Sequence, residues 1–484
     1  MNEVVYSNLQ EKIIFALFLI LLVWAPIPLG SNRDIGWTLL STASTILLAW
    51  SAALLSVRRM TLTKSFFRLK LVYLMFIALV SLQIAQVVLI PIDIIKQYSP
   101  QHLGKLSLQD IYVGAEALSI SVDRNQTIEY LIRFISYISV FLLTVLLVNG
   151  NSRLVWLLLA MSVSGVLQSI YGIGELIYNY AATSAFTILH GTFVNNNHFA
   201  AYLNMVVGSV LGLLLLATYS NRSGTVGFIR SFGTQQFSVT VYLILCIVAL
   251  LLAQSRGAGI AFVVAFLSVF VLININDKGK EWFGRRMVGL ALLLLFMIFL
   301  FGNKIIIDEL KNVDTDMLTR MEIWEISLQI FKDFPLFGVG AGNFATVFPV
   351  YESRHMSVFV NHVHNDYIQV LVEQGISGFA IMAILILLCI GAAFRILRAS
   401  SNVHVLVATS VGMFGVVSML VHALVDFNFY IPSNAAYFFV FLGLSVANID
   451  KVKKATRART RTSQTAIDEQ VLERPAFTLS EPQA

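Results

Sequence analysis

The sequence predicts an all-α polytopic membrane protein with about twelve transmembrane helices and one large polar loop. Two observations carry this prediction. Of the 484 residues, 57% are hydrophobic and 12% are charged, whereas a soluble domain is about half apolar and a quarter charged. Uninterrupted apolar runs of spanning length also recur along the chain. Because backbone groups in lipid must pair internally, such runs are expected to be helices.

The expected spans leave no large soluble remainder, so residues 1–448 are predicted to form a single transmembrane domain. The seventh to ninth spans are short, and a re-entrant hairpin around residues 254–257 is the alternative to two full spans at the seventh and eighth. The tenth could begin as an interfacial helix. The twelve segments lie near residues 13–29, 36–55, 71–93, 129–148, 154–176, 198–218, 238–253, 257–273, 287–302, 369–394, 404–426 and 432–448.

The first apolar run and the cysteines limit the interpretation further. The run follows Glu11 and Lys12 and lacks a small-residue cleavage site, so we expect a retained span rather than a cleaved signal peptide. Cys246 and Cys389 both fall inside expected spans without metal-ligand spacing. They are predicted to be small core residues.

Lysine and arginine residues predict the orientation, because they are enriched in cytoplasmic loops. With a cytoplasmic N-terminus, the short outer loops hold only Arg33 and Arg256. Both termini are therefore expected in the cytoplasm, with the large polar loop on the periplasmic or outer side. The short cytoplasmic loops then hold fourteen basic residues: Arg58, Arg59, Lys64, Arg68, Lys70, Arg153, Arg222, Arg230, Lys278, Lys280, Arg285, Arg286, Arg395 and Arg398.

The net charge of +6 does not indicate a nucleic-acid partner, because the basic residues are spread through the loops. The densest cluster, residues 451–461, directly follows the last span. It is expected to lie near anionic lipid headgroups, within a disordered cytoplasmic tail at residues 449–484. A second outer loop, residues 96–126, is longer than a simple connector and is expected to help cover the site.

The polar loop between the ninth and tenth spans, residues 303–367, is where we expect the function to lie. Within it, residues 318–331 predict an amphipathic helix, because Leu318, Met321, Trp324, Leu328 and Phe331 recur at spacings of three and four. Arg320 and Trp324 are one turn apart and share a face. The alternative to a functional role is a helix lying on the membrane, with Arg320 snorkelling to water.

The glycine-rich segment 338–342 follows a proline-terminated helix rather than a strand, so it does not predict a nucleotide-binding loop. A tight loop whose bare backbone approaches a neighbour or ligand is the better interpretation. Beyond it, His362 and His364 lack companions at good zinc-ligand spacing, so a metal site is a weak alternative. His364 lies where the loop meets a span, and a histidine there suits proton transfer from a sugar hydroxyl.

Ionisable residues at the edges of spans are costly and therefore informative. Glu129 and Arg133 are one turn apart and are expected to pair. Arg256 lies in a very short outer connection without an adjacent acid, where its planar fork could hold a lipid diphosphate. Ordinary snorkelling to lipid phosphates is the alternative. Acids also end three spans on the outer side and could orient an arginine or the histidine, or cap a helix: Glu175, Glu373 and Asp426.

Four segments together resemble the O-antigen ligase and polymerase superfamily of bacterial membrane enzymes. Their order and spacing agree with that family over roughly residues 185 to 430, whereas the N-terminal spans are generic. The segments are Gly-Thr-Phe-Val-Asn-Asn-Asn-His-Phe-Ala-Ala-Tyr at 191–202, Ser-Arg-Gly at 255–257, Arg320…Trp324…Pro335…Gly-Val-Gly-Ala-Gly-Asn-Phe at 338–344, and His-Asn-Asp-Tyr-Ile…Glu-Gln-Gly-Ile-Ser-Gly from 364 to 378.

The resemblance implies a GT-C-like glycosyltransferase of the inner membrane that needs neither metal nor other cofactor. Such enzymes take a glycan from undecaprenyl diphosphate on the periplasmic face. A ligase moves it to lipid A–core, which we slightly favour, and a polymerase moves it to another lipid-linked repeat unit. A protein acceptor is less favoured because the tail is short and basic. A transporter or flippase is the alternative of a different class, although no internal repeat is evident.

The resemblance also implies roles for individual residues. Arg256 and Arg320 would bind the diphosphate and stabilise its charge as it leaves, and His364 would orient or deprotonate the acceptor hydroxyl. Further substrate contacts would come from Asn196, His198, Asn365 and Glu373.

Overall fold

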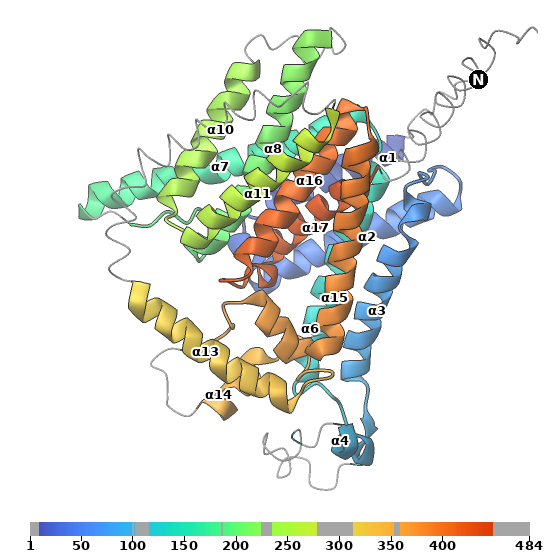
Figure 1. Cartoon of the computed structure of the whole chain (residues 1–484), viewed down its shortest axis with the longest axis vertical. Coiled ribbons are helices and arrows are strands. Elements are labelled where there is room, and N and C mark those ends of the chain that lie inside the picture. The colour runs from blue at the N-terminus through green and yellow to red at the C-terminus, as the bar shows by residue number, and fades with distance from the viewer. Residues whose placement is uncertain are drawn as a thin grey trace, which may run out of the picture.

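The computed structural model describes residues 9–98, 101, 116–184, 187–223, 235–277, 313–352 and 359–448. This part is a bundle of long helices (Figure 1). It also contains one two-stranded antiparallel sheet, β1 (Ile90–Pro91) with β2 (Ala117–Leu118). The expected ninth span at 287–302, the start of the polar loop at 303–312 and the tail at 449–484 lie outside the described residues.

Helices coincide with eleven of the twelve expected segments, which confirms the all-α polytopic class. Eight of the described helices are long and apolar enough to cross a membrane, and two apolar helices are shorter. The number twelve therefore stays a prediction. The eleven helices are α1 (Leu9–Trp24), α2 (Asp34–Ser56), α3 (Lys70–Val87), α6 (Arg124–Leu147), α7 (Asn151–Thr183), α8 (Asn196–Ser223), α10 (Gln235–Leu252), α11 (Arg256–Ile275), α15 (Asp366–Ala399), α16 (Val403–His422) and α17 (Pro432–Val446).

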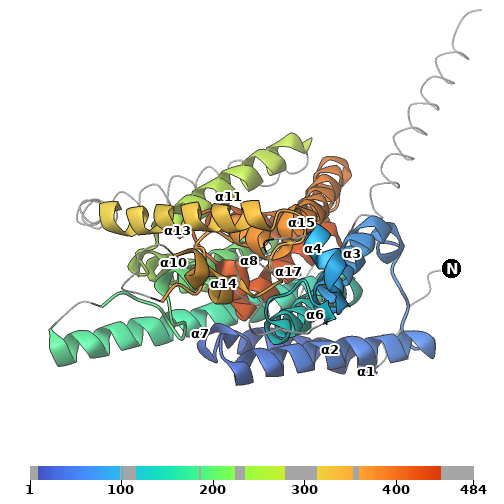
Figure 2. The same ribbon diagram turned by 90° about the horizontal axis from the view of Figure 1, so that it is seen from below.

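The centre of the bundle is formed by α8, α16 and α17, which are largely buried. Figure 2 shows α8 and α17 between α2 and α7 on one side and α11 on the other. Glycines allow the closest approach: a Cβ added at Gly415 would lie 2.3 Å from the Phe441 ring. Cys246 and Cys389 are free and fully buried, so the prediction of small core residues is confirmed.

Several helix ends expected on the outer side lie at one end of the bundle, the outer end. Asn196 donates to the Ala253 carbonyl oxygen at 2.8 Å and joins the start of α8 to the turn after α10. At the opposite end, Arg153 pairs with Glu11 at 2.6 Å. Both contacts agree with the alternation of helix direction that the lysine and arginine distribution predicts, and the sidedness of the two ends stays a prediction.

Two helices of the polar loop lie across this outer end, α13 (Val313–Asp333) and α14 (Phe344–Tyr351) (Figure 1). The expected helix at 318–331 is present, but its orientation differs from a simple apolar stripe. Leu318, Met321 and Leu328 are mostly exposed, whereas the buried face carries isoleucines at the same spacing: Ile323, Ile326 and Ile330. The helix has two apolar faces, so periodicity alone does not determine which one packs.

Helix α15 is broken at Gly375, whose φ of 63° and ψ of −169° are not helical. The tenth expected span therefore consists of a short first segment, from Asp366, and a long apolar second segment. The break leaves the carbonyl groups of Val372 and Glu373 without helical partners at the outer end of the bundle. These groups become the attachment point for the glycine-rich loop.

Candidate functional site

The glycine-rich loop packs its backbone directly against the break in α15. A Cβ added at Gly338, where φ is +69°, would lie 2.4 Å from the Glu373 carbonyl carbon. The amides of Val339 and Gly340 donate to the carbonyl oxygens of Val372 and Glu373 at 2.9 and 3.0 Å. The expectation of a bare-backbone contact is confirmed, and the neighbour is the kinked helix.

The side chain of Glu373 binds the glycine-rich loop and is fully buried. Its Oε2 accepts hydrogen bonds from the Gly342 amide at 2.7 Å and from the Tyr430 hydroxyl. Its Oε1 accepts from the Phe344 amide at 3.3 Å and from Gln369 Nε2 at 3.1 Å. Four donors therefore satisfy one carboxylate, which joins α15, the glycine-rich loop and the segment after α16.

The end of the second outer loop packs on the same glycine-rich loop. Asn343 accepts from the Asp123 amide at 2.8 Å and donates to the hydroxyls of Ser121 and Thr127 at 3.1 and 2.9 Å. The Val122 amide donates to the Val339 carbonyl oxygen at 3.0 Å. This part of the loop therefore covers the site from one side, as expected, while residues 99–100 and 102–115 lie outside the described residues.

The segment carrying His362 and His364 is fixed by side chains of two helices. Gln369 accepts from the Val363 amide at 3.1 Å and donates to His362 Nδ1 at 3.0 Å. Trp324 donates from Nε1 to the Val363 carbonyl oxygen at 3.0 Å. Like Arg320, one turn earlier on α13, it therefore binds a backbone carbonyl oxygen of a neighbouring segment. Burial lowers the pKa of His362 from 6.5 to about 3, and His198 and His364 nearby lower it further. His362 is therefore neutral at ordinary pH.

His364 occupies a left-handed backbone conformation, with φ of 55°, directly before α15. Asn365 caps the helix and accepts from the amides of Tyr367 and Ile368 at 3.0 and 3.1 Å. Its Nδ2 also donates to the Leu424 carbonyl oxygen at 2.9 Å. These bonds hold an unfavourable conformation that directs the imidazole of His364 toward the segment after α16.

Asp426 lies between two histidines from distant parts of the chain. Its Oδ1 is 3.6 Å from His198 Nε2 and 3.6 Å from His364 Nδ1. These separations exceed hydrogen-bond distance, so a small movement would close either contact. Burial acts to raise the pKa of Asp426, but the two imidazoles more than offset it and hold that pKa well below its usual range. Asp426 is therefore a carboxylate.

Phe427 is surrounded by three histidine rings. His362 stacks on it with a centroid distance of 4.2 Å, and His198 and His364 meet it edge-on at 4.5 and 4.8 Å. The ring fixes the relative positions of the imidazoles and separates His362 from the other two.

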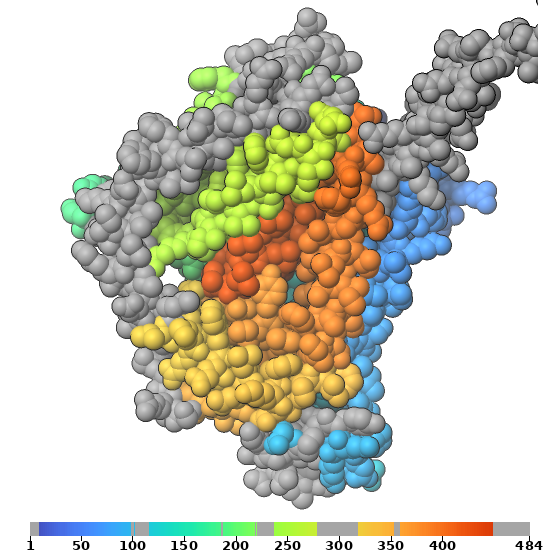
Figure 3. Space-filling model, in the orientation of Figure 1, coloured from blue at the N-terminus to red at the C-terminus, as the bar shows by residue number. Residues whose placement is uncertain are grey.

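Arg320 reaches residues 422–426, and Gly257, the residue after Arg256, packs on the same segment. Arg320 donates from Nη1 to the Val425 carbonyl oxygen. Arg256 begins α11 after Ser255, which caps the helix by accepting from the Ala258 amide at 3.3 Å. A Cβ added at Gly257 would lie 2.7 Å from Val425 Cγ2 and 2.9 Å from His422 Cδ2. Figure 3 shows the red end of the chain between α11 and α13.

The structure thus brings Arg320, His364 and His198 to one segment, and it places the backbone next to Arg256 against the same segment. Asn196, Asn365 and Glu373 lie in the same region, but the protein itself uses their side chains for hydrogen bonds. His422 and Phe427 were not identified from the sequence, and Asp426 was recognised only as an acid at the end of a span. That position was the only signal available for Asp426, because His198 and His364 are far from it in sequence.

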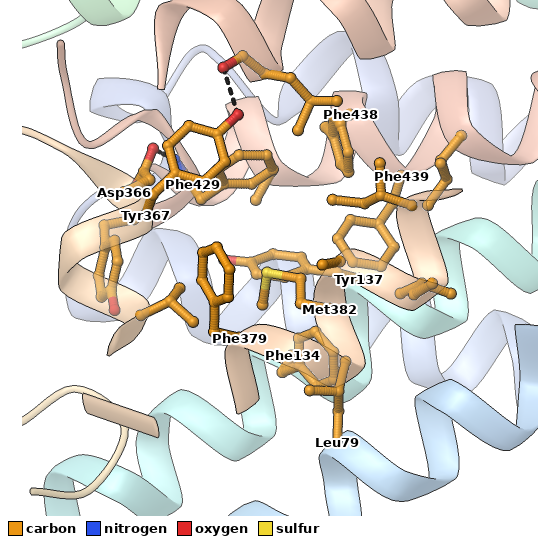
Figure 4. Close-up of a pocket in the computed structure, with 18 of the residues that line it drawn as sticks. Leu79, Phe134, Tyr137, Asp366, Tyr367, Phe379, Met382, Phe429, Phe438 and Phe439 are labelled. Carbon is orange, nitrogen blue, oxygen red and sulfur yellow. Dashed lines mark hydrogen bonds between the residues drawn. The ribbon is translucent and has the colours of Figure 1, made fainter. Parts of the chain in front are cut away.

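Two cavities flank this region and share Tyr130 and Tyr430. One is apolar, has a volume of about 100 Å³ and lies between α6, α15 and α17. Figure 4 shows Phe379, Met382 and Phe439 among its walls, with Asp366 at one side. The other is polar, has a volume of about 430 Å³ and is lined by Asn32, Gln126, Tyr130, Arg133, Val194, Asn195, His198, Gly342, Ala345, Asn361, His362, Gln369, Glu373, Phe427 and Tyr430.

No group of three or more His, Cys, Asp or Glu side chains is placed to hold a metal ion in the part of the chain that the structure describes. Arg320 brings positive charge to residues 422–426, and Arg256 lies at the start of α11, next to Gly257, which packs on them. Because an arginine side chain stays charged at any ordinary pH, it can bind an anion without further help.

Comparison with known proteins agrees with the resemblance seen in the sequence. The family model described as O-Antigen ligase matches residues 241–383. No curated protein matches the chain. The matched segment contains Arg256, Arg320, the glycine-rich loop, His364 and Glu373, whereas His198 and Asp426 lie outside it. Within this segment, the chain is therefore similar to the O-antigen ligase family.

Proposed function

We propose that the protein is a glycosyltransferase of the inner membrane that moves a glycan from undecaprenyl diphosphate to a sugar hydroxyl of lipid A–core. The match of residues 241–383 to the O-antigen ligase family model supports glycan transfer in polysaccharide biosynthesis. The single observation that carries the proposal further is that Arg320, His364 and the start of α11, which carries Arg256, meet around residues 422–426. In this proposal both termini are cytoplasmic and the site faces the periplasm.

The arginines suit a diphosphate leaving group. When the bond between the anomeric carbon and the diphosphate oxygen breaks, the oxygen keeps the electron pair and negative charge grows on the phosphate. A guanidinium offers a planar fork of donors that fits phosphate oxygens. Arg256 is exposed at the start of α11, where the next residue packs on Val425, and Arg320 of α13 bonds the Val425 carbonyl oxygen. The diphosphate would therefore lie between these two helices. No metal is required in this proposal.

His364 suits the acceptor side of the reaction. The carboxylate of Asp426 faces its Nδ1 and favours the tautomer with the proton there, which leaves Nε2 free to accept one. The acceptor oxygen forms its bond to the anomeric carbon while the diphosphate departs, and the hydroxyl proton passes to Nε2. Asp426 then stabilises the resulting imidazolium.

The remaining predicted residues take different parts in this proposal. Asn196 and Asn365 position Arg256 and His364 through the backbone contacts that they make. Glu373 positions the glycine-rich loop. His198 faces Asp426 and lines the polar cavity, so it is the one among them best placed to contact substrate.

A gel profile of surface polysaccharide and lipid-linked intermediates from a strain lacking this gene tests the proposal. Long polymer accumulating on undecaprenyl diphosphate, together with bare lipid A–core, is the expected result. Single repeat units in place of long chains would show a polymerase instead. Unchanged glycan pools would reject both enzymes and leave transport as the alternative. The same strain carrying the wild-type gene is the control, since it must restore the normal profile.

A further inference from the structure

The polar cavity is separate from the region around the arginines. Its lining includes His198, His362 and Phe427, but not Arg256, Arg320 or His364. The Phe427 ring forms the boundary, because His362 stacks on it from the cavity side. The volume of about 430 Å³ falls within the range of roughly 300–1,000 Å³ that is usual for small-molecule pockets.

Carboxamide side chains from separate segments converge on this cavity. Asn32 follows α1, Gln126 lies in the first turn of α6, and Asn361 precedes the histidines. Within the described residues, the structure gives none of these three side chains a hydrogen-bond partner. Each offers one acceptor oxygen and two donor hydrogens to a molecule in the cavity.

The inner wall adds one fixed donor. Gln369 uses its Nε2 to donate to His362 Nδ1, so the neutral imidazole carries its proton on Nε2. Gln369 has no remaining donor hydrogen, because its Nε2 also donates to Glu373, and its oxygen accepts from the Val363 amide. The wall is therefore rigid and presents a neutral hydrogen-bond donor.

Aromatic rings complete the lining. The ring centroids of Tyr130 and Tyr430 lie 5.7 Å apart, and Phe427 lies next to the histidines. A sugar ring has a flat face of C–H groups and a rim of hydroxyls that both donate and accept. Flat aromatic walls with carboxamides at the rim match both features.

The charge of the cavity favours an uncharged ligand. Glu373 is satisfied by four donors. Arg133 is the one lysine or arginine among the residues lining the cavity, and it is already paired with Glu129 at 3.1 Å and placed over the Trp37 ring at 4.5 Å. A diphosphate would therefore be held less well here than between Arg256 and Arg320.

We infer that the polar cavity is a saccharide subsite, which binds neutral sugar hydroxyls of one substrate through Gln126 and Asn361 beside His198. This inference rests on the proposed function and deepens it. His198 links the two regions, because it lines the cavity and lies 3.6 Å from the carboxylate of Asp426, which also faces His364. The sugar belongs either to the donor glycan or to the acceptor.

Two variants, Gln126→Leu and Asn361→Leu, test the subsite. Each replaces an exposed hydrogen-bonding side chain by an apolar side chain of similar size. Asn149→Leu, at the opposite end of the bundle, is the matched control. The full-length protein would be purified and reconstituted into liposomes. Three probes are used: lipid-linked glycan extracted from a strain lacking the gene, lipid A–core from that strain, and undecaprenyl diphosphate without sugar.

Each cavity variant is expected to raise the KM for one glycan-bearing substrate about fivefold or more, in line with the loss of one or two hydrogen bonds. Affinity for the bare diphosphate lipid should stay within about twofold of wild type, because its charged group binds elsewhere. A raised KM for the lipid-linked glycan assigns the subsite to the donor, and a raised KM for lipid A–core assigns it to the acceptor.

The subsite is overturned if wild-type protein transfers glycan normally while both variants keep wild-type KM values. It is also overturned if they lose affinity for the bare diphosphate lipid. Failure of the proposed function looks different, since wild-type protein itself would then transfer no glycan in the same assay.

Discussion

Two buried carboxylates at the same end of the bundle differ in how many hydrogen bonds the protein gives them. Glu373 accepts hydrogen bonds from four donors on three segments. Asp426 accepts one from the Phe427 amide at 2.9 Å and otherwise faces two imidazoles at 3.6 Å. A carboxylate whose bonding capacity is filled by the protein supports structure. One that faces titratable groups with capacity to spare is suited to chemistry.

The first prediction concerns Asp426 and the histidine that it faces, His364. His364→Ala removes the group proposed to accept the proton, so glycan transfer should fall about 100- to 10,000-fold. Asp426→Asn should cause a smaller loss, because the base remains but its tautomer and charge are no longer supported. Initial rates of transfer in liposomes measure both. Normal thermal stability in detergent is expected, since His364 makes few contacts that hold the fold.

Full transfer by His364→Ala would remove this histidine from the mechanism. His362→Ala serves as the comparison, because His362 is neutral and lies on the far side of Phe427. Equal rate losses in the two variants would mean that the whole histidine segment, rather than the base, is being disturbed.

The second prediction concerns Glu373, the carboxylate that accepts four hydrogen bonds. Glu373→Ala leaves the Gly342 and Phe344 amides, Gln369 and Tyr430 without their acceptor. A loss of about 3–5 kcal/mol in stability is expected, because several buried donors lose their acceptor and each unsatisfied buried donor costs about 1–3 kcal/mol. Reduced protein in the membrane and a lower melting temperature in detergent measure this loss.

Glu373→Gln is the matched control, because it keeps the size and one acceptor oxygen. Its melting temperature should lie between those of wild type and Glu373→Ala. A variant Glu373→Ala that is as stable as wild type but inactive would reverse the comparison and assign this carboxylate to substrate, as the sequence alone had indicated.

The third prediction concerns the backbone contact that Glu373 supports. Gly338→Ala should destabilise the protein by about 2–3 kcal/mol, because the new Cβ meets backbone atoms and φ is positive. Gly391→Ala is the control, since nothing lies within 4 Å of a Cβ placed there. Melting temperatures of the two variants are compared, and equal values would mean that the loop moves freely away from α15.

The fourth and smallest effect is a dependence of stability on pH. The pKa of His362 is about 3 in the folded protein and 6.5 in an exposed histidine. As pH falls below 6.5, the unfolded chain therefore takes up a proton that the folded protein does not, and stability decreases. The loss at about pH 5 relative to about pH 7.5 should be about 1–2 kcal/mol from this residue.

Replacing His362 by asparagine should remove that part of the pH dependence. His190→Asn, at a partly buried histidine outside the polar cavity, is the control and should keep the slope. Melting temperatures at the two pH values give the slopes. An unchanged slope in His362→Asn would show that this imidazole is not buried in the folded protein.

Much of the fold could be predicted because spanning length and apolar composition are local properties. The expected segments coincide with α1 to α17 wherever the structure describes them. The exact ends could not be predicted in the same way. Helix α1 stops at Trp24, before Pro26 and Pro28, although the apolar run continues to residue 29.

The site was predictable only in part, for a related reason. Arg256, Arg320 and His364 stand out as polar groups in short motifs at the edges of apolar runs. Whether a polar side chain forms its hydrogen bonds within the protein depends on partners that lie outside the motif. Asn196 bonds a carbonyl oxygen 57 residues away, and Asn365 bonds one 59 residues away.

The sequence by itself therefore determined the class of protein, and it predicted the alternation of the helices and the residues proposed to bind a diphosphate or accept a proton. These follow from composition and from the chemistry of single side chains. Only the tertiary structure decided that Glu373 is saturated, that Asp426 faces two histidines, and that Ile323, Ile326 and Ile330 form the packed face of α13. Hydrogen bonding and burial depend on which distant segments meet, and that is a property of packing rather than of local order.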